Sequence, residues 1–359
     1  MADTAVKPKK RAPRKKKKIE SWRNELNQNA MSGSELSMIE LEKRLGSEFL
    51  EDFQIILSRP RELDPNKIRV LWCHDLPKDP EAVNALSNGG WKQFHKLVFV
   101  SHWQQQHFIN MFDIPWSHTV VIKNSINEIP VDVAEKFQNT DQLRMIYHTT
   151  PHRGLGILVP VFQKLMQDQP DLDIHLDVFS SFELYGWKER DEAFEPLYSQ
   201  IREHPNMTYH GAQDNDTVRE ALAKAHIFAY PSIWTETSCI ALIEAMSAGC
   251  LCIHPNLGAL PETSAHWTFQ YPFHEDPNRH AAQFYDMLTH GISLIKSDSV
   301  GPLTMKLNGQ KSFTDVTYPW EVRINEWKGL LDSIRDLPRE IPERAEPDQL
   351  GAYNYSVDV

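Results

Sequence analysis

The chain has few cysteines, four in 359 residues, and their spacing fits neither a metal site nor a disulfide framework. Three of the four lie in or beside apolar runs. We therefore expect all four to be reduced residues of the hydrophobic core. This use of cysteine favours a reducing compartment, and we expect a cytoplasmic protein.

Long apolar segments are also missing. No run of hydrophobic residues is long enough to span a bilayer, so we expect no transmembrane segment. No apolar segment follows the basic N-terminal run, which argues against a signal peptide. The 16 histidines include no H-E-x-x-H spacing, and the sequence shows no internal repeat. Asp171-x-Asp173 precedes a predicted strand and is expected to be a surface turn, so we expect no metal.

Charge is distributed unevenly. Residues 1–18 carry nine Lys or Arg and one Asp, whereas the remaining 341 residues carry 29 basic and 48 acidic side chains. The short basic segment contains proline and has no apolar face, so we expect a disordered tail. It is either a solvated end without a role, a nuclear-import signal, or a tether for a polyanion such as host-cell nucleic acid or an anionic membrane.

Most of the chain alternates apolar runs with amphipathic segments. With 41% hydrophobic residues it can bury two ordinary cores. Strands alternating with helices predict α/β domains with parallel, doubly wound sheets. The predicted units are a tail (1–18), a first domain (19–135), a second domain (136–317), a C-terminal helix that crosses back to the first domain (318–336) and a final tail (337–359).

The stretch Tyr230–Glu262 is the most informative in the sequence. An apolar strand ends at Pro231, a polar turn follows, and good helix formers precede Gly249, where a helix would stop. Glu236 precedes this helix and Glu244 lies two turns inside it, so both carboxylates can face one cleft. Glu244 lies among apolar helix residues and needs a partner. The plainer interpretation makes Ser238 an N-cap and Glu236 a solvated turn residue.

Glu236 and Glu244 match the E-x7-E motif of the retaining glycosyltransferases of family four, which have the GT-B fold. The flanking sequences Pro-Ser, Ala-Met-Ser-Ala-Gly-Cys and Gly-Ala-Leu-Pro-Glu also resemble that family. The resemblance implies two Rossmann-like domains that face each other across a cleft. It also implies that Glu244 binds the ribose of a nucleotide-sugar and that Glu236 contacts the transferred sugar.

The same resemblance assigns the donor phosphates to two turns of the second domain. Arg153 and Gly154 match the basic Lys-Gly-Leu element, although the Arg that usually precedes it is replaced by Thr149 or Thr150. Amide groups at a helix N-terminus suit a diphosphate, and Thr237 and Ser238 occupy that position. Gly211 takes the place where the family contacts the base.

In the first domain the resemblance points to two further places. Gly33 and Ser34 stand where a glycine-containing turn before the first helix faces the donor phosphates. His74 follows a predicted strand and corresponds to a histidine near the transferred sugar; without the resemblance it would be read as a loop cap. The predicted catalytic residues are therefore His74, Arg153 and Glu236.

The resulting prediction is a metal-independent hexosyl- or pentosyl-transferase that needs no cofactor and moves a sugar from a nucleotide-sugar to a hydroxyl group. The acceptor is a glycan or hydroxymethylated DNA, and Lys92, Lys96 and Lys123 are expected to add basic charge near the cleft. A nucleotide-sugar epimerase should lack the E-x7-E helix, and a sugar phosphorylase needs a pyridoxal-phosphate lysine. A non-catalytic polyanion- or glycan-binding protein on the same fold is the remaining alternative.

Overall fold

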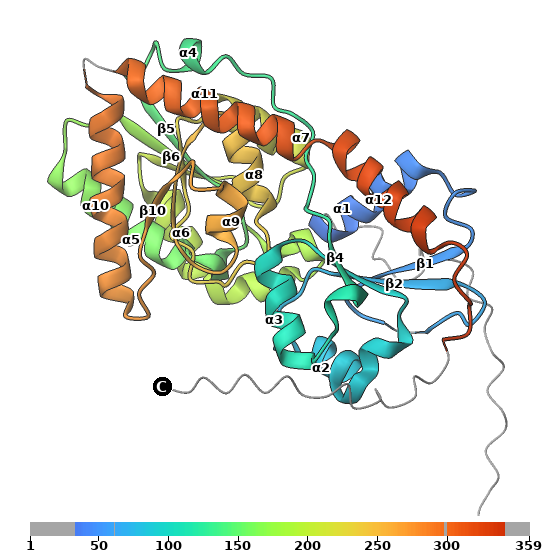
Figure 1. Cartoon of the computed structure of the whole chain (residues 1–359). Helices are drawn as coiled ribbons and strands as arrows, with labels where there is room; N and C mark the ends of the chain where they lie inside the picture. Colours follow the sequence, from blue (N-terminus) through green and yellow to red (C-terminus); the bar gives the residue numbers. More distant parts are fainter. Residues whose placement is uncertain (1–32, 61, 298–299, 342–359) are drawn as a thin grey trace, which may run out of the picture.

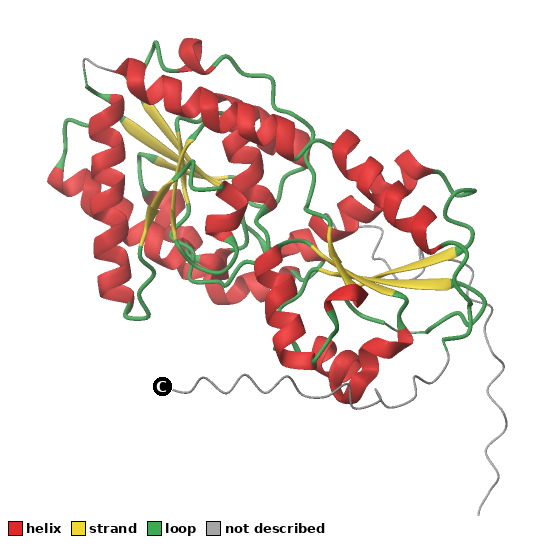
Figure 2. Cartoon of the chain, in the orientation of Figure 1, coloured by secondary structure: helices red, strands yellow, loops and turns green. Residues whose placement is uncertain are grey.

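The computed structural model describes residues 33–60, 62–297 and 300–341. The basic tail expected over residues 1–18 and most of the final tail lie outside them. The described chain forms two α/β domains side by side, each built on a parallel sheet with helices packed on its faces (Figures 1 and 2). The predicted fold class of two doubly wound parallel-sheet domains is confirmed.

The first domain contains a four-stranded sheet in the order β1-β2-β3-β4, with every pair parallel. Its strands are short apolar runs, largely buried, as expected for a sheet covered on both faces. The strands are β1 (Phe53–Leu57), β2 (Ile68–Cys73), β3 (Lys96–Phe99) and β4 (Thr119–Val121), and the helices are α1 (Gly33–Leu45), α2 (Pro80–Leu86) and α3 (His102–Phe112).

The second domain contains a six-stranded parallel sheet in the order β10-β9-β8-β5-β6-β7. Its strands are β5 (Leu143–Tyr147), β6 (Ile174–Val178), β7 (Met207–Tyr209), β8 (Ile227–Ala229), β9 (Leu251–Pro255) and β10 (Phe269–Tyr271). Its helices are α4 (Val133–Lys136), α5 (Leu155–Asp168), α6 (Glu195–Glu203), α7 (Asn215–Lys224), α8 (Ile240–Ser247), α9 (Leu260–Ser264), α10 (Pro277–Ile295) and α11 (Val300–Thr317). The order of the strands reverses between β5 and β8. Such a switch point opens a crevice at the carboxyl ends of the strands, where α/β sheets bind ligands.

The chain passes twice between the domains. Residues 122–132, the linker, lead from β4 to α4, and Pro319 joins α11 to α12 (Trp320–Ile334). These two crossings lie side by side, because the amide of Ile126 donates to the carbonyl of Tyr318 at 3.0 Å and Ile126 forms a bridge with Pro319. Helix α12 then packs on the first domain (Figure 1), where its Trp327 ring lies 4.9 Å from that of Trp72.

The structure adds two details to the sequence-based expectation. The segment from Ser297 to Thr317, whose structure the sequence left open, contains helix α11. The core of the second domain also includes Ile129, Val133 and Phe137. Ile129 and Val133 precede residue 136, where the sequence analysis begins this domain. The four cysteines are free and buried, as expected. Within the described ranges, no helix is both long and apolar enough to cross a membrane.

Candidate functional site

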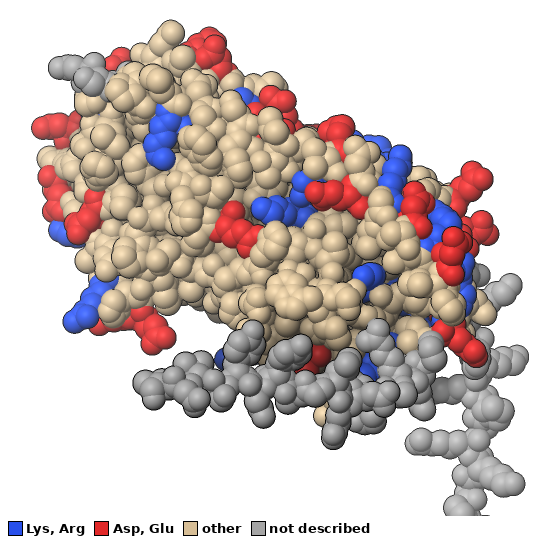
Figure 3. All heavy atoms as spheres, viewed as in Figure 1, with Lys and Arg blue, Asp and Glu red and all other residues tan. Residues whose placement is uncertain are grey.

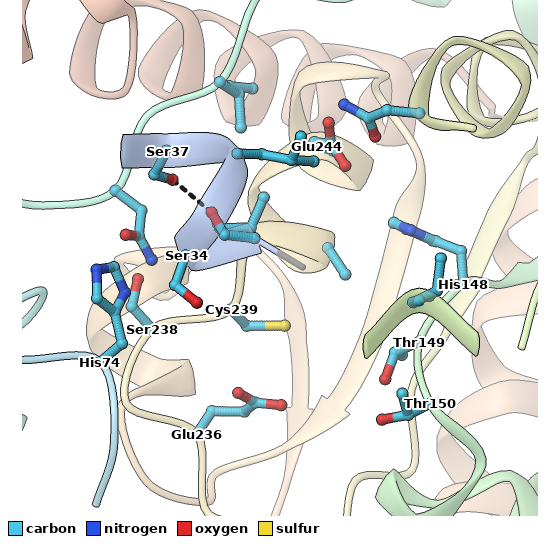
Figure 4. A pocket seen from close by; sticks show the side chains of 18 of the residues that line it. Ser34, Ser37, His74, His148, Thr149, Thr150, Glu236, Ser238, Cys239 and Glu244 are labelled. Carbon is cyan, nitrogen blue, oxygen red and sulfur yellow. Dashed lines mark hydrogen bonds between the residues drawn. The ribbon is translucent and has the colours of Figure 1, made fainter. Parts of the chain in front are cut away.

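A pocket of about 950 Å³ lies between the two domains, at the carboxyl ends of both sheets. Helix α1 and the segments after β2 and β4 line it from the first domain. The turns after β5 and β8, with helix α8, line it from the second. In Figure 4 the side chains of Ser34 and Ser238 lie near His74, while Thr149 and Thr150 stand on the far side of the pocket. The residues that it brings together from the predicted site are Gly33, Ser34, His74, Arg153, Gly211, Glu236, Thr237, Ser238 and Glu244.

Glu236 is held rigidly by its neighbours. The residue is 3% exposed, and its Oε1 accepts a hydrogen bond from the hydroxyl of Tyr230 and lies 2.6 Å from Nη1 of Arg153. Gly258 packs against the same loop with φ +60°, and a Cβ there would lie 2.5 Å from the carbonyl oxygen of Glu236. The interpretation of Glu236 as a solvated turn residue is therefore wrong, because its carboxylate is buried and paired.

Arg153 reaches the pocket from the turn between β5 and α5. Burial is the largest single influence and would lower the pKa of its guanidinium, but Glu236, Tyr230, Tyr185 and Cys239 together outweigh burial. The pKa is therefore raised, and the side chain stays charged. Its Nε atom is buried and has no hydrogen-bond partner among the described residues. Gly154 makes this turn possible, since its φ is +135° and a Cβ would lie 2.3 Å from the carbonyl oxygen of Pro231. Gly154 itself does not line the pocket, whereas its neighbour Arg153 does.

Glu244 does have the charged partner that its apolar setting requires. Burial raises the pKa of its carboxyl group, and Arg219 on α7 opposes this shift with Nη1 at 3.3 Å from Oε1. Arg219 lines the pocket but was not predicted. In the sequence, nothing distinguishes Arg219 from the other charged residues of the polar helix α7. Its contact with Glu244 depends on how α7 packs against α8, which sequence spacing does not reveal.

Several buried polar atoms in the pocket wall have no hydrogen-bond partner among the described residues. Such atoms are rare in folded proteins, because burying a polar group without a partner costs about 1–3 kcal/mol. Their concentration in one pocket indicates that a polar ligand or water supplies the missing partners. They are Nε2 of His74, Oδ1 of Asn124, Oγ of Ser125, Nε2 of His148, and Oγ1 of Thr149 and of Thr150.

The turn that precedes α8 joins the two domains through Thr237. Its hydroxyl donates to the carbonyl of His74 at 2.9 Å, and its own carbonyl accepts from the hydroxyl of Ser101 at 2.6 Å. Ser238 is not the N-cap of this helix. The cap position is Cys239, which makes no side-chain capping bond, so the interpretation of Ser238 as an N-cap is wrong.

Gly33 and Ser34 form the first turn of α1 as far as the chain is described. A Cβ at Gly33 would lie 2.8 Å from Cδ1 of Ile240, so the first turns of α1 and α8 approach closely at the pocket. Gly211 also lines the pocket and adopts φ +67°, which favours glycine at this turn after β7.

Two expectations about charged residues have different outcomes. Lys92, Lys96 and Lys123 do not line the pocket: Lys96 donates to the carbonyl of Ser117, and Lys123 lies near Glu262. Their expected contribution of basic charge near the cleft stays a prediction. Asp171-x-Asp173 lies in an exposed turn before β6, as expected, and the described residues contain no cluster of three or more metal-ligating side chains.

His74 follows β2 and packs its ring 4.7 Å from that of Trp72. Burial lowers the pKa of His74 to about 3, so the imidazole is neutral at physiological pH. A neutral imidazole can accept or donate a hydrogen bond but cannot stabilise a leaving phosphate by charge. His74 can therefore offer a polar contact in the pocket, and its predicted catalytic role stays a prediction.

We expect His74 to make the protein less stable in acid. The unfolded chain binds a proton at His74 near pH 6.5 and the folded chain only near pH 3, so stability falls as pH falls through this window. The contribution is about 2 kcal/mol at pH 5 relative to pH 7. Urea unfolding of His74→Asn across this range should show a shallower pH dependence than wild type, by about one proton. The same change at exposed His107 is the control, and an unchanged slope in His74→Asn would contradict the prediction.

Comparisons with known proteins agree with this geometry. Residues 144–290 match the family model described as "Glycosyl transferases group 1". A 149-residue stretch is 27% identical to a subunit of the human enzyme phosphatidylinositol N-acetylglucosaminyltransferase and covers 40% of this chain. The match spans 28% of that relative's length.

Solved structures extend the likeness across both domains. A glycosyltransferase from Rickettsia africae superposes with a TM-score of 0.61 at 16% identity, covering 87% of this chain and 84% of that one. HepE from Anabaena, in complex with UDP and glucose, gives a TM-score of 0.57 at 15% identity over 74% of this chain and 72% of its own. The fold is that of the GT-B glycosyltransferases. Residues 144–290 are thus similar to the group 1 glycosyl transferases, and the likeness in fold extends over both domains.

Proposed function

We propose that this protein is a retaining glycosyltransferase that moves a sugar from a nucleotide-sugar to a hydroxyl acceptor. The observation that carries the proposal is the pocket itself. It combines the paired Glu236 and Arg153, the buried Glu244 and a set of polar atoms without partners among the described residues, at the switch point of the second sheet. The group 1 match, residues 144–290, includes the parts of the second domain that line this pocket.

Each charged group has a distinct part in the proposed reaction. Glu244 accepts hydrogen bonds from the ribose, and Glu236 contacts hydroxyls of the transferred sugar. Arg153 and the amides of Thr237 and Ser238 stabilise the diphosphate as the bond from the anomeric carbon to phosphate breaks. The acceptor oxygen bonds to the same face of that carbon, and its proton passes to the departing phosphate oxygen. No metal is needed, since Arg153 supplies the positive charge.

The experiment is a screen of the purified protein against nucleotide-sugars, including UDP-glucose, UDP-N-acetylglucosamine and GDP-mannose. Thermal stabilisation reports binding by mass action, and release of nucleoside diphosphate reports turnover. The product should keep the anomeric configuration of the donor, and a chelator should leave the rate unchanged. An inverted product, or no response to any donor, would refute the proposal.

The acceptor is proposed to be a glycan, with hydroxymethylated DNA as the alternative. DNA would be held by the basic residues 1–18, because Lys92, Lys96 and Lys123 do not line the pocket. On the face in Figure 3, basic and acidic side chains are interspersed. Contacts to DNA phosphates require clustered positive charge, so this observation favours the glycan.

If DNA is the acceptor, deleting residues 1–18 should abolish salt-dependent binding to duplex DNA. Each neutralised phosphate releases counterions, so the slope of log affinity against log salt is about −0.9 per contact. Fluorescence anisotropy across a series of salt concentrations measures this slope in the full chain and the truncated chain. Absence of salt-dependent binding in the full chain, with transfer to an oligosaccharide, would eliminate the DNA alternative.

A further inference from the structure

Arg219 makes contacts that the proposed chemistry does not require. Its Nη1 lies 3.3 Å from Oε1 of Glu244, and its Nη2 donates to the carbonyls of Asn127 and Glu128, both at 2.8 Å. Asn127 and Glu128 belong to the linker between the two domains. One guanidinium therefore connects the carboxylate that lines the pocket with a segment that joins the domains.

The geometry explains why a single side chain can do this. Arginine presents a planar fork of donors, so one Nη can hold a carboxylate while the other holds carbonyl groups. The Arg219 side chain is 16% exposed and that of Glu244 is 7% exposed, so the pair is largely shielded from solvent. In such a setting the strength and direction of the contacts depend on fixed geometry more than on screening by salt.

We propose that Arg219 is a positioning residue that orients Glu244 for the donor ribose and couples occupancy of this site to the linker. This inference rests on the proposed function for the identity of the ligand. Arg219 favours the ionised form of Glu244 against the effect of burial, as does a side-chain hydrogen bond from Asn215, and it fixes Oε1. The carboxylate is thereby oriented to accept from a ribose hydroxyl. A ligand that forms a hydrogen bond with the carboxylate of Glu244 changes the contact of that carboxylate with Arg219. Arg219 transmits the change to the carbonyls of Asn127 and Glu128.

A second attachment of the same linker provides a matched control. Lys311 on α11 donates to the carbonyl of Ile129 at 2.8 Å and pairs with Asp315 at 2.7 Å. Asp315 in turn accepts from Ser247, one turn along α8 from Glu244. Among charged groups on the described elements around α8, Arg219 is within ion-pair distance of Glu244, whereas Lys311 pairs with Asp315 and with the carboxylate of Glu128. Replacing Lys311 loosens the linker without touching Glu244.

The experiment compares Arg219→Met, Arg219→Lys and Lys311→Met with wild type. Calorimetry measures the affinity for whichever of UDP, GDP, ADP or CDP wild type binds most tightly. We expect Arg219→Met to weaken binding about tenfold or more, Arg219→Lys to recover part of the loss, and Lys311→Met to change it less than about twofold. The 2′-deoxy nucleotide should be affected less, because it makes fewer contacts with Glu244.

Hydrogen exchange then tests the coupling. Nucleotide should alter exchange of the linker amides in wild type and in Lys311→Met, but not in Arg219→Met. Equal affinities of wild type and Arg219→Met, or a linker that does not respond in wild type, would overturn the inference.

A titration without nucleotide separates this inference from the proposed function. The pKa of Glu244, followed by carboxyl carbon NMR, should rise in Arg219→Met and stay constant in Lys311→Met, because only the first change removes the neighbouring positive charge. If no nucleotide binds wild type, the proposed function fails while this titration still decides whether Arg219 controls Glu244. A constant pKa in both variants would overturn the inference in either case.

Discussion

Replacing Glu236 by Gln should reduce turnover by about 10²-fold while leaving most of the donor affinity intact. The carboxylate lies 2.6 Å from Nη1 of Arg153 and accepts a hydrogen bond from Tyr230. The Gln side chain carries no negative charge, so it would no longer form the ion pair with the guanidinium. A loss of that size is typical when one preorganised polar group is removed from a catalytic site. Single-turnover transfer from the active nucleotide-sugar measures the effect separately from donor binding.

The choice of substitution matters because Glu236 is buried. Removing one partner of a buried ion pair leaves the other charge uncompensated, which commonly costs about 3–5 kcal/mol of stability. Glu236→Gln keeps the volume and the contact with Tyr230, whereas Glu236→Ala also opens a cavity. Exposed Glu275, replaced by Gln, is the matched control. Glu236→Gln with wild-type turnover and a normal unfolding midpoint would remove Glu236 from the site.

The strands of both domains were predictable because they are short apolar runs that end in turn residues. The stretch from Ile227 to Pro255 is an example: two buried strands enclose a helix that stops where Gly249 adopts φ +65°. Helix α11 was harder to predict, because its apolar residues form no clear stripe and Gly301 and Gly309 interrupt the pattern.

The site was predictable only as far as local sequence specifies it. The spacing of Glu236 and Glu244 is fixed by one turn and one helix, so it can be read from the sequence. The ion pair between Arg153 and Glu236 joins residues 83 positions apart, and it depends on β5 and β8 being neighbours in the sheet. The contact of Arg219 with the linker likewise follows from the packing of α7 beside the crossing between domains.

Arg153→Ala should weaken binding of a nucleoside diphosphate by about 10²-fold and leave binding of the matching nucleoside nearly unchanged. The Nε of Arg153 is buried without a partner among the described residues, which leaves a donor for a phosphate oxygen. Hydrogen bonds between a guanidinium and a phosphate are charge-assisted and strong, so removing them should lower the affinity for the diphosphate and not the affinity for the nucleoside. Calorimetry with UDP and uridine, or with the pair for the preferred base, measures the difference.

Two further variants separate this effect from damage to the fold. Arg153→Lys keeps the charge but not the fork geometry, so its affinity for the diphosphate should fall between wild type and Arg153→Ala. Arg153→Ala alone leaves Glu236 as an unpaired buried carboxylate, which repels the ligand and destabilises the loop. The double variant Arg153→Met with Glu236→Gln removes both charges and should recover stability without recovering diphosphate affinity. Equal losses for nucleoside and diphosphate would mean that Arg153 does not touch the phosphates, and that its charge serves to hold Glu236 in place.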